Sequence, residues 1–493
     1  MQKAPYLTPV LVGIGVASRR DEDWTAALEP LDLMLEAVRA AGRDAGHAAL
    51  LTACQYIAVP RGRWRYRNPA GAIAADIGAR HATTVLASVG VLQQSLLGEA
   101  CARITRGEAH TTLVAGADAG YRLLRAQIAG ITAPEREQDD DPDHYLAPKD
   151  DLFHAVESRA GFEMPVGLYA IMESAWRARH GWSVGEHRDR LADLYNNFAT
   201  IAAANPHAWQ RTALTASDIR NASARNPMQA FPYTRAHCSS WNVDQAAALL
   251  FCSEARALEL GIRRDRWIYP LASTHSNHMT SVSARADLSR CIGADLAGEA
   301  ALDAAGLTID QVDLLELYSC FPIAVTSYAE ALRVTMPRAL TITGGMPFAG
   351  GPFNNYVLQA SCRAAELLRK RGHGAALLSS VSGMLTKPGF GLWSTMPGAQ
   401  GFVEQDVSTA VAAQTATVPV LDDYTGPAAM AGYTVLHSRA QTVRAVALVD
   451  TPAGQRVLTT SEDPALIARL EREEYVGRVM HINGTQLMEA TPS

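Results

Sequence analysis

The sequence predicts a layered α/β sandwich built from two similar halves, with a helical insertion and a small β-rich C-terminal domain. A repeat carries the prediction. An amphipathic helix, a glycine stop, an acidic turn and an apolar strand occupy residues 35–60 and recur at 298–322. A glycine-bearing turn, a helix and a strand of small residues occupy 88–119 and recur at 350–383. Two copies of one α/β unit predict two packed lobes, with a ligand cleft where equivalent turns meet.

The first half alternates apolar strands with helices. The β-branched run at 9–16 predicts a buried first strand, and Pro30 precedes a helix at 31–42. The elements that follow are a strand at 50–59, a helix at 69–77, a strand at 83–87, a helix at 92–105 and a strand at 111–117. This alternation predicts a mostly parallel sheet covered by helices on both faces.

The alternation breaks between residues 120 and 240. The acidic run at 137–143 predicts a solvated loop, and the helical patterns after it predict an insertion that caps the cleft. Sheet strands resume at 244–252 and 267–273. From residue 415, alternating strands and a turn at 451–454 predict a separate β-rich domain. We therefore expect three units: 1–250 with its insertion, 251–405, and 415–493.

Composition narrows the class of protein. The 493 residues are 48% hydrophobic and 19% charged, as in soluble proteins with large cores. A net charge of −6 gives no reason to expect nucleic acid; the one basic stretch, 61–67, is either a solvated loop or a contact for a phosphorylated ligand. Seven cysteines without C-x-x-C spacing predict neither a metal site nor a disulfide framework. No signal-peptide pattern or membrane-spanning run occurs, so we expect a cytoplasmic protein without membrane partners.

Turns that follow strands are the first places to look for chemistry. Ser88 lies in such a turn and is either a nucleophile, which needs a neighbouring base, or a helix cap. In the second half, the turns at 350–355 and 379–383 offer backbone N–H groups that can hold developing negative charge. Gly350, Gly351 and Asn354 come from the first of these turns, and Ser380 from the second.

Two further segments carry reactive side chains. At 317–322, Tyr318 can donate to a carbonyl oxygen, and Cys320 is a nucleophile only if its pKa is lowered; the alternative is a strand-end turn with a core cysteine. At 274–278, His275 and His278 lie in a predicted loop, as a general base or ligand contact, or as surface polar residues.

Five motifs occur in one order over most of the chain: NPMQAFPYT (226–234), DRWIYP (265–270), LYSCFP (317–322), TITGGMPFAGGPFNNY (341–356) and GMLTKPGFGLWSTMP (383–397). With the duplicated halves, they make the chain resemble the thiolase superfamily. It is most similar to the type 1 thiolase-like proteins, acetyl-CoA acetyltransferase-like chains that carry an additional C-terminal domain.

The resemblance implies a coenzyme A cleft covered by the insertion, with acyl-CoA as a substrate rather than a permanently bound cofactor. It places the acyl end near Ser88, Tyr318, Gly351 and Ser380, with Gly350, Gly351 and Asn354 as coenzyme A contacts. It also implies a homodimer or a partner enzyme subunit.

Departures from the family pattern limit what chemistry carries over. Ser88 stands where thiolases have the nucleophilic cysteine, and Gly351 replaces the histidine that activates it. Ser380 replaces the second cysteine, and Tyr318 replaces the Asn or His of the oxyanion hole. The two-step mechanism through an acyl-cysteine therefore cannot run.

Two functions remain open. The first is a divergent acyl-CoA C-acyltransferase, which makes or breaks a carbon–carbon bond of a β-ketoacyl substrate without an acyl-cysteine. Its oxyanion would be held by Tyr318 and by N–H groups near Gly351 and Ser380, with His275, His278 or Cys320 as proton carrier. The second is a non-catalytic acyl-CoA-binding or scaffold protein. A hydrolase that uses Ser88 is disfavoured because no G-x-S-x-G turn surrounds it.

Overall fold

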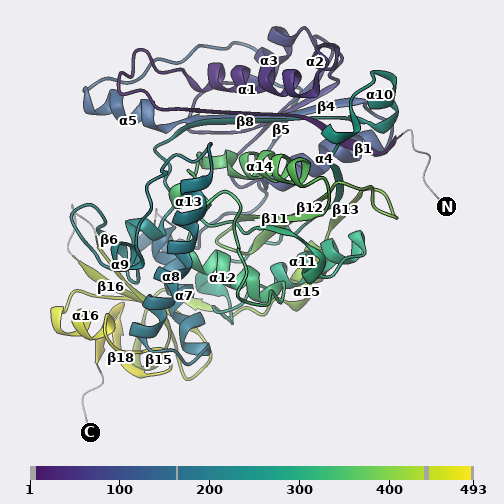
Figure 1. The fold of residues 1–493 in the computed structure, drawn as a ribbon. Helices are drawn as coiled ribbons and strands as arrows, with labels where there is room; N and C mark the ends of the chain where they lie inside the picture. Colours follow the sequence, from purple (N-terminus) through teal and green to yellow (C-terminus); the bar gives the residue numbers. More distant parts are fainter. Residues whose placement is uncertain (1–6, 163–164, 438–442, 490–493) are drawn as a thin grey trace.

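Five layers, alternating helices and sheets, make up the body of the protein, and a β-barrel lies at one side (Figure 1). The structure is a computed structural model that describes residues 7–162, 165–437 and 443–489. Residues 1–6, part of the segment that lacks a signal-peptide pattern, lie outside it. The first sheet has the order β1 (Pro9–Arg19), β8 (Asp244–Ser253), β4 (Thr111–Ala119), β2 (Tyr56–Pro60), β3 (Thr83–Ala87), β5 (His144–Leu146).

The second sheet has the order β10 (Leu314–Glu316), β11 (Ala375–Ser382), β12 (Lys387–Ser394), β9 (Tyr269–His275), β13 (Val403–Asp406). Both sheets are mixed. In the first, β2, β3, β4 and β5 pair in parallel, but β8 is antiparallel to β1 and β4. The prediction of a mostly parallel sheet is therefore only partly right, because β8 returns from the insertion rather than from a crossover helix.

Equivalent helices of the two halves occupy equivalent layers, which confirms the duplication. The helices α4 (Gln93–Thr105) and α14 (Tyr356–Arg371) lie together between the sheets. The helices α1 (Pro30–Ala45) and α3 (Pro69–Ile77) cover the outer face of the first sheet, and α11 (Ile292–Ala305) covers that of the second (Figure 1).

The predicted strand at 50–59 is wrong over its first part. A helical turn, α2 (Ala49–Thr52), precedes β2. In this turn Leu50 is fully buried and Leu51 packs over Gly42 of α1, so the apolar run is buried against a helix. An apolar run alone cannot distinguish these two outcomes.

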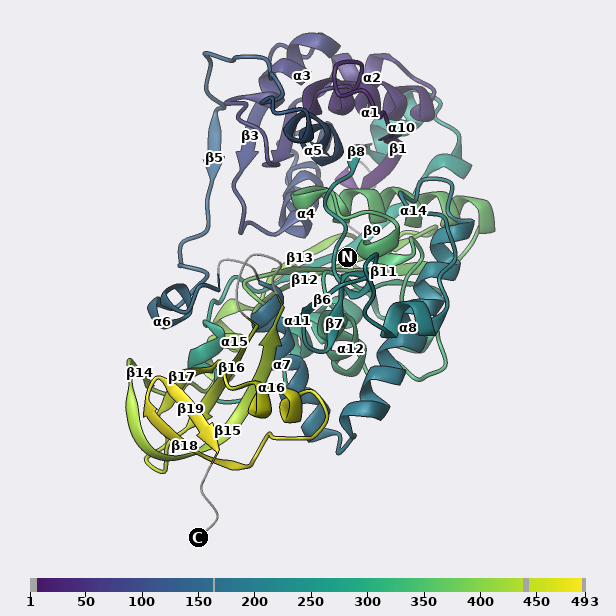
Figure 2. The same ribbon diagram turned by 90° about the vertical axis from the view of Figure 1, so that its left-hand side faces the viewer.

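In its described residues the insertion contains five α-helices: α5 (Gly120–Ile128), α6 (Ala155–Arg159), α7 (Val166–Arg179), α8 (Val184–Ala204) and α9 (Ala216–Arg220). The longest, α8, packs over α13 (Gly345–Phe348), and α7 lies between α12 (Pro322–Ala331) and the barrel (Figure 2). Part of the insertion thus supports the barrel instead of capping a cleft. Among the described helices, none has the length and apolarity needed to cross a bilayer.

The acidic and basic stretches of the first half pair with each other. Arg67 contacts Asp141 at 2.7 Å, and the amide of Asn68 donates to Asp140 at 2.7 Å. Arg63 contacts the fully buried Asp118 at 2.9 Å. The acidic loop is therefore bound to the basic one, and the structure favours this pairing over a phosphate contact at 61–67.

Over its described residues, the C-terminal domain forms a closed five-stranded barrel. Its strands are β15 (Tyr424–Leu436), β16 (Arg444–Asp450), β17 (Arg456–Ser461), β18 (Val479–Gly484) and β19 (Gln486–Glu489). They pair in the cyclic order β15–β16–β17–β19–β18, with β17 and β19 parallel. The helix α16 (Pro464–Leu470) lies between β17 and β18 in the chain. This is the strand order of an OB-fold, a five-stranded Greek-key barrel.

Candidate active site

The first candidate, Ser88, lies in the turn between β3 and α4. Its N–H donates to the Leu146 carbonyl at 2.7 Å, and its carbonyl accepts from the Val91 N–H at 3.2 Å. The cap of α4 is Leu92, without a side-chain hydrogen bond, so Ser88 is not a helix cap. The neighbouring Gly90 has a φ of +96°, and Pro148 fills the space where its side chain would be. Within the described residues, no His, Asp or Glu hydrogen-bonds the Ser88 hydroxyl.

A row of polar residues crosses the second sheet opposite this turn. Cross-strand pairing aligns Ser380 of β11 with Gly389 of β12, and Gly389 with His275 of β9. Paired residues point to the same face of a sheet, and two strand spacings separate Ser380 and His275 by roughly 10 Å. Gln94 in the first turn of α4 lies over Gly389. Ser380 therefore belongs to a strand that continues into a hairpin, not to the turn before a helix that its Gly-rich surroundings suggest.

The structure also corrects the prediction that His275 lies in a loop. It is the last residue of β9 and only 8% exposed. Its Nε2 lies 3.8 Å from an Asp406 carboxylate oxygen, and its Nδ1 is buried without a hydrogen bond. Burial lowers the His275 pKa, and the nearby positive charge of Lys387 adds to this effect while Asp406 opposes it. A neutral imidazole can accept a proton.

The second histidine of this segment lies apart from the row. His278 is half-buried, and its Nε2 is 3.1 Å from the Thr280 hydroxyl. Its backbone N–H donates to the Ser276 hydroxyl at 3.2 Å. These contacts within its own loop account for His278.

Tyr318 and Cys320 follow β10, as predicted. The Tyr318 N–H donates to the hydroxyl of Ser379, the neighbour of Ser380 in β11, at 2.8 Å. Burial raises the pKa of the Tyr318 phenol, so it can act only as a neutral donor. Burial also raises the pKa of Cys320 to about 12, although the Tyr169 side chain lowers it in part. Cys320 is therefore a thiol near neutral pH, and a thiolate nucleophile is not supported.

The same holds for every cysteine. Burial raises the pKa of all seven free thiols, Cys54, Cys101, Cys238, Cys252, Cys291, Cys320 and Cys362. A thiol that stays protonated is a poor nucleophile. The absence of an acyl-cysteine stays a prediction.

The turn at 350–355 is closed by its own contacts. Gly350 has a φ of +108° and packs against Gln245. The Gly351 N–H donates to the Ser240 carbonyl at 2.8 Å, so it is not free to hold an oxyanion. A β-carbon at 351 would lie 2.1 Å from the Ser239 hydroxyl oxygen. The Ser239 N–H donates to the Cys320 carbonyl at 3.1 Å, which joins this turn to the Tyr318–Cys320 segment.

Asn354 faces α4. Its side-chain oxygen accepts from Gln93 at 3.2 Å, and the Gln93 oxygen accepts from the Val357 N–H at 2.7 Å. The Asn354 amide nitrogen is buried without a partner. Asn354 therefore links the two central helices, and a contact with coenzyme A stays a prediction.

Sequence reasoning missed Lys387, the first residue of β12. Its ammonium donates to the Gly90 carbonyl at 2.7 Å, across the boundary between the halves. The residue is 4% exposed, and burial lowers its pKa, although the negative charge of Asp150 raises it in part. The signal was present in the motif GMLTKPGFGLWSTMP, where a lysine interrupts an apolar segment.

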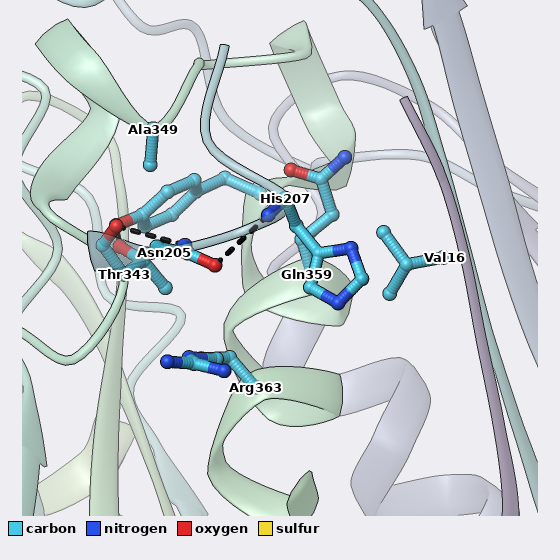
Figure 3. Close-up of a pocket in the computed structure, with 8 residues that line it drawn as sticks. Val16, Asn205, His207, Thr343, Ala349, Gln359 and Arg363 are labelled. Atoms are coloured by element: carbon cyan, nitrogen blue, oxygen red, sulfur yellow. Dashed lines mark hydrogen bonds between the residues drawn. The ribbon is translucent and has the colours of Figure 1, made fainter. Parts of the chain in front are cut away.

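Two hollows described in the structure lie away from these residues. A cavity of ≈ 20 Å³, room for a water molecule, is lined by Asn205, His207, Gln359, Arg363 and their neighbours (Figure 3). A groove of ≈ 480 Å³ runs between α11 and β13. Neither is lined by a residue predicted for the site. In the described part of the chain, no cluster of three or more His, Cys, Asp or Glu could hold a metal ion.

Comparison with known proteins agrees with the fold. The chain superposes on a monomeric SCP2-thiolase-like protein type 1 from Mycobacterium smegmatis with a TM-score of 0.81 and 25% identity, covering 98% of this chain and 99% of that one. This chain is a member of the thiolase superfamily. No family model matches it.

Curated relatives of this thiolase-superfamily chain match over shorter stretches. An acetyl-CoA acetyltransferase of Methanothermobacter thermautotrophicus is 29% identical over 34% of this chain and 40% of its own length. A 3-ketoacyl-CoA thiolase of Erwinia tasmaniensis is 25% identical over 43% and 50%. The matches thus span half or less of these relatives. The Ltp2-ChsH2(DUF35) aldolase shares the fold, with a TM-score of 0.60 at 16% identity over 80% of this chain and 99% of that one.

Proposed function

We propose that this chain is a divergent acyl-CoA C-acyltransferase that makes or breaks a carbon–carbon bond next to a thioester without an acyl-cysteine. One observation supports it most: buried polar groups from both halves meet where the start of α4 packs on the second sheet. Ser380 and His275 share one face of the second sheet, and Gln94 of α4 lies over Gly389, which pairs with both. Buried polar groups cost free energy, so their concentration at this place favours a use in chemistry.

In this proposal His275 moves the proton. It is neutral because burial lowers its pKa, and its Nδ1 has no partner. The reaction needs a base that removes a proton from carbon or oxygen, and a donor for the oxyanion. Tyr318 can serve as a neutral donor. Acyl-CoA would be a transient substrate, and the chain would need no resident cofactor.

The test is turnover of thioesters by the purified full chain. The protein is incubated with acetoacetyl-CoA and CoA, with pairs of acetyl-CoA and acyl-CoA, and with longer β-ketoacyl-CoAs, and products are followed by mass spectrometry. A general base contributes about 10²- to 10⁴-fold, so His275→Asn should lose that much rate. His278→Asn is the matched control, because His278 contacts only its own loop. No product from any pairing would sink the enzymatic proposal.

A second candidate, an acyl-CoA-binding or scaffold protein, is favoured by the turn at Gly351. Its N–H is already bonded to Ser240, and Ser239 occupies the space of the family's histidine. Calorimetry separates the two functions. Binding of acetoacetyl-CoA without turnover would support the second, and turnover would exclude it.

A further inference from the structure

Lysine is scarce in this chain, and one lysine is buried. Of the 44 basic residues only four are lysines: Lys3, Lys149, Lys370 and Lys387. Lys149 and Lys370 are exposed, whereas Lys387 is 4% exposed. Arginine serves almost everywhere else, and the two side chains differ: the ammonium is a compact charge with three donors, and its pKa shifts readily on burial. A buried lysine in such a sequence requires a specific reason.

The hydrogen bonds of Lys387 leave donors unused. Its ammonium donates to the Gly90 carbonyl at 2.7 Å, and the Ser382 hydroxyl from the paired position of β11 donates to the same oxygen at 3.4 Å. Among the described residues, no carboxylate lies within salt-bridge distance of Lys387. A buried cation without a counter-ion is costly, so the structure favours a ligand that brings negative charge.

Two other buried polar atoms over the face of the sheet that carries Lys387 have no partner. Lys387, Gly389 and Gly391 point to the same face of β12, because side chains alternate along a strand. His275, which pairs with Gly389 and is close enough for the Lys387 charge to lower its pKa, has an unbonded Nδ1. Gln94 is 2% exposed and lies over Gly391, about 13 Å further along β12, and its side-chain oxygen is unbonded. Buried polar atoms are normally bonded, so these mark a place for a ligand or water.

The turn before Lys387 is strained. Met384 and Leu385 have φ values of 49° and 76°, in the left-handed region that favours glycine. Each such residue costs on the order of 1–3 kcal/mol, and such strain gathers at functional sites. The Arg285 side chain donates to the Gly383 carbonyl at 3.1 Å, and the Cys291 thiol donates to the Leu385 carbonyl at 2.7 Å. These buried contacts hold the turn that sets the direction of Lys387.

Residues beside the Gly90 carbonyl, to which Lys387 donates, reach the surface. Ser88 and Ser382 are half-buried, and Val89 is 41% exposed.

We propose that Lys387 is a catalytic residue that binds the carbonyl oxygen of the acyl thioester and stabilises the negative charge that develops on it. The inference rests on the proposed function, since it assigns a further group to the same site. The role is electrostatic: the ammonium donates a hydrogen bond to the oxygen, and no bond to the lysine forms or breaks. It replaces the oxyanion donor that the closed Gly351 N–H cannot supply.

Four lysines make a direct test simple. The full chain is reductively methylated with isotope-labelled formaldehyde, alone, with free CoA and with acetoacetyl-CoA, and the labelling rate of each lysine is followed by peptide mass spectrometry. We expect acetoacetyl-CoA to slow labelling of Lys387 at least tenfold, while free CoA does not and Lys149 and Lys370 stay unchanged. If Lys387 is labelled at the same rate with and without bound acetoacetyl-CoA, the inference about Lys387 is overturned and the proposed function is not.

If Lys387 is labelled too slowly for its rates to be compared, variants of Lys387 test the inference instead. Calorimetry gives the preference for acetoacetyl-CoA over free CoA. A hydrogen bond to a charged group is worth roughly 10- to 100-fold in affinity, so Lys387→Met should lose that much preference. Lys387→Arg should keep more of it, and Lys370→Met all of it. An unchanged preference in Lys387→Met, with the thermal midpoint retained, would overturn the inference.

The outcomes separate this inference from the proposed function. Protection of Lys387 without turnover sinks the enzymatic function and leaves Lys387 as the thioester-binding residue. Turnover of the thioester without protection of Lys387 supports the enzymatic function and overturns the role of Lys387. Absence of any thioester binding by the wild type overturns both.

Discussion

Replacing Gly351 with alanine tests whether Ser239 fills the space beside Gly351, the position that corresponds to the histidine of thiolases by resemblance. A β-carbon at 351 would lie 2.1 Å from the Ser239 hydroxyl oxygen and 3.2 Å from the Met346 methyl carbon. Favourable contact requires about 3.5–4.0 Å, so the alanine must push Ser239 aside. Gly351 lies outside the left-handed region, so backbone strain adds nothing. Overpacking of this kind costs about 1–3 kcal/mol, and we expect Gly351→Ala to lower the free energy of unfolding by that amount.

Urea denaturation of the wild type, Gly351→Ala, Ser239→Ala and the double variant forms a thermodynamic cycle. Without the Ser239 hydroxyl, the nearest atom of that residue is its β-carbon at 3.4 Å, so the double variant should recover most of the loss. Gly185→Ala is the control, since that glycine faces open space in α8 and alanine should stabilise the helix by about 0.5–1 kcal/mol. If Gly351→Ala costs nothing, or costs the same with and without the hydroxyl, the place is not filled by Ser239.

Three more perturbations should change stability or thiol labelling in a definite direction. Burial raises the pKa of Asp244 from 3.8 to about 6, so its contribution to stability is fully present below pH 3.8 and lost as the pH rises through about 6. Between pH 4 and pH 7 the free energy of unfolding should therefore fall by up to roughly 3 kcal/mol through Asp244, and Asp244→Asn should remove this fall. Glu474→Gln, which leaves the buried Arg177 without its counter-ion, should cost about 3–5 kcal/mol by calorimetry, more than removal of the arginine itself. Iodoacetamide at pH 7 should label no thiol rapidly in the native protein and all seven in denaturant; one fast thiol would contradict the raised pKa values.

Much of the fold could be predicted because the repeat and its periodicity are local. Pro69–Ile77 and Thr83–Ala87 have the predicted bounds, since a proline, a glycine and polar residues mark their ends. The strand predicted at 50–59 failed because Leu50 is buried equally well in a helical turn, where Leu51 also packs against α1. The mixed sheets could not be foreseen, because the direction of β8 depends on a path through 120 residues of insertion.

The site was less predictable because it depends on register. Nothing in the sequence shows that Ser380 and His275 share a face, since this follows from the pairing of both with Gly389. The closure of Gly351 by Ser239 joins segments more than 100 residues apart. Lys387 could have been noticed by its rarity, but only the structure brings it to Gly90.

Hydrogen bonds connect the barrel to the turn that precedes Lys387. Arg456 of β17 donates to the backbone carbonyl of Arg285, and the Arg285 guanidinium in turn donates to the Gly383 carbonyl in the strained turn before Lys387. On the other side, Arg177 of the insertion joins Glu474 of the barrel at 2.7 Å. Buried arginines therefore form a continuous connection from the barrel to the turn that directs Lys387. Because a chain cut before β15 would lose this connection, the barrel contributes to the geometry of the candidate site, and assays of thioester chemistry require the full chain.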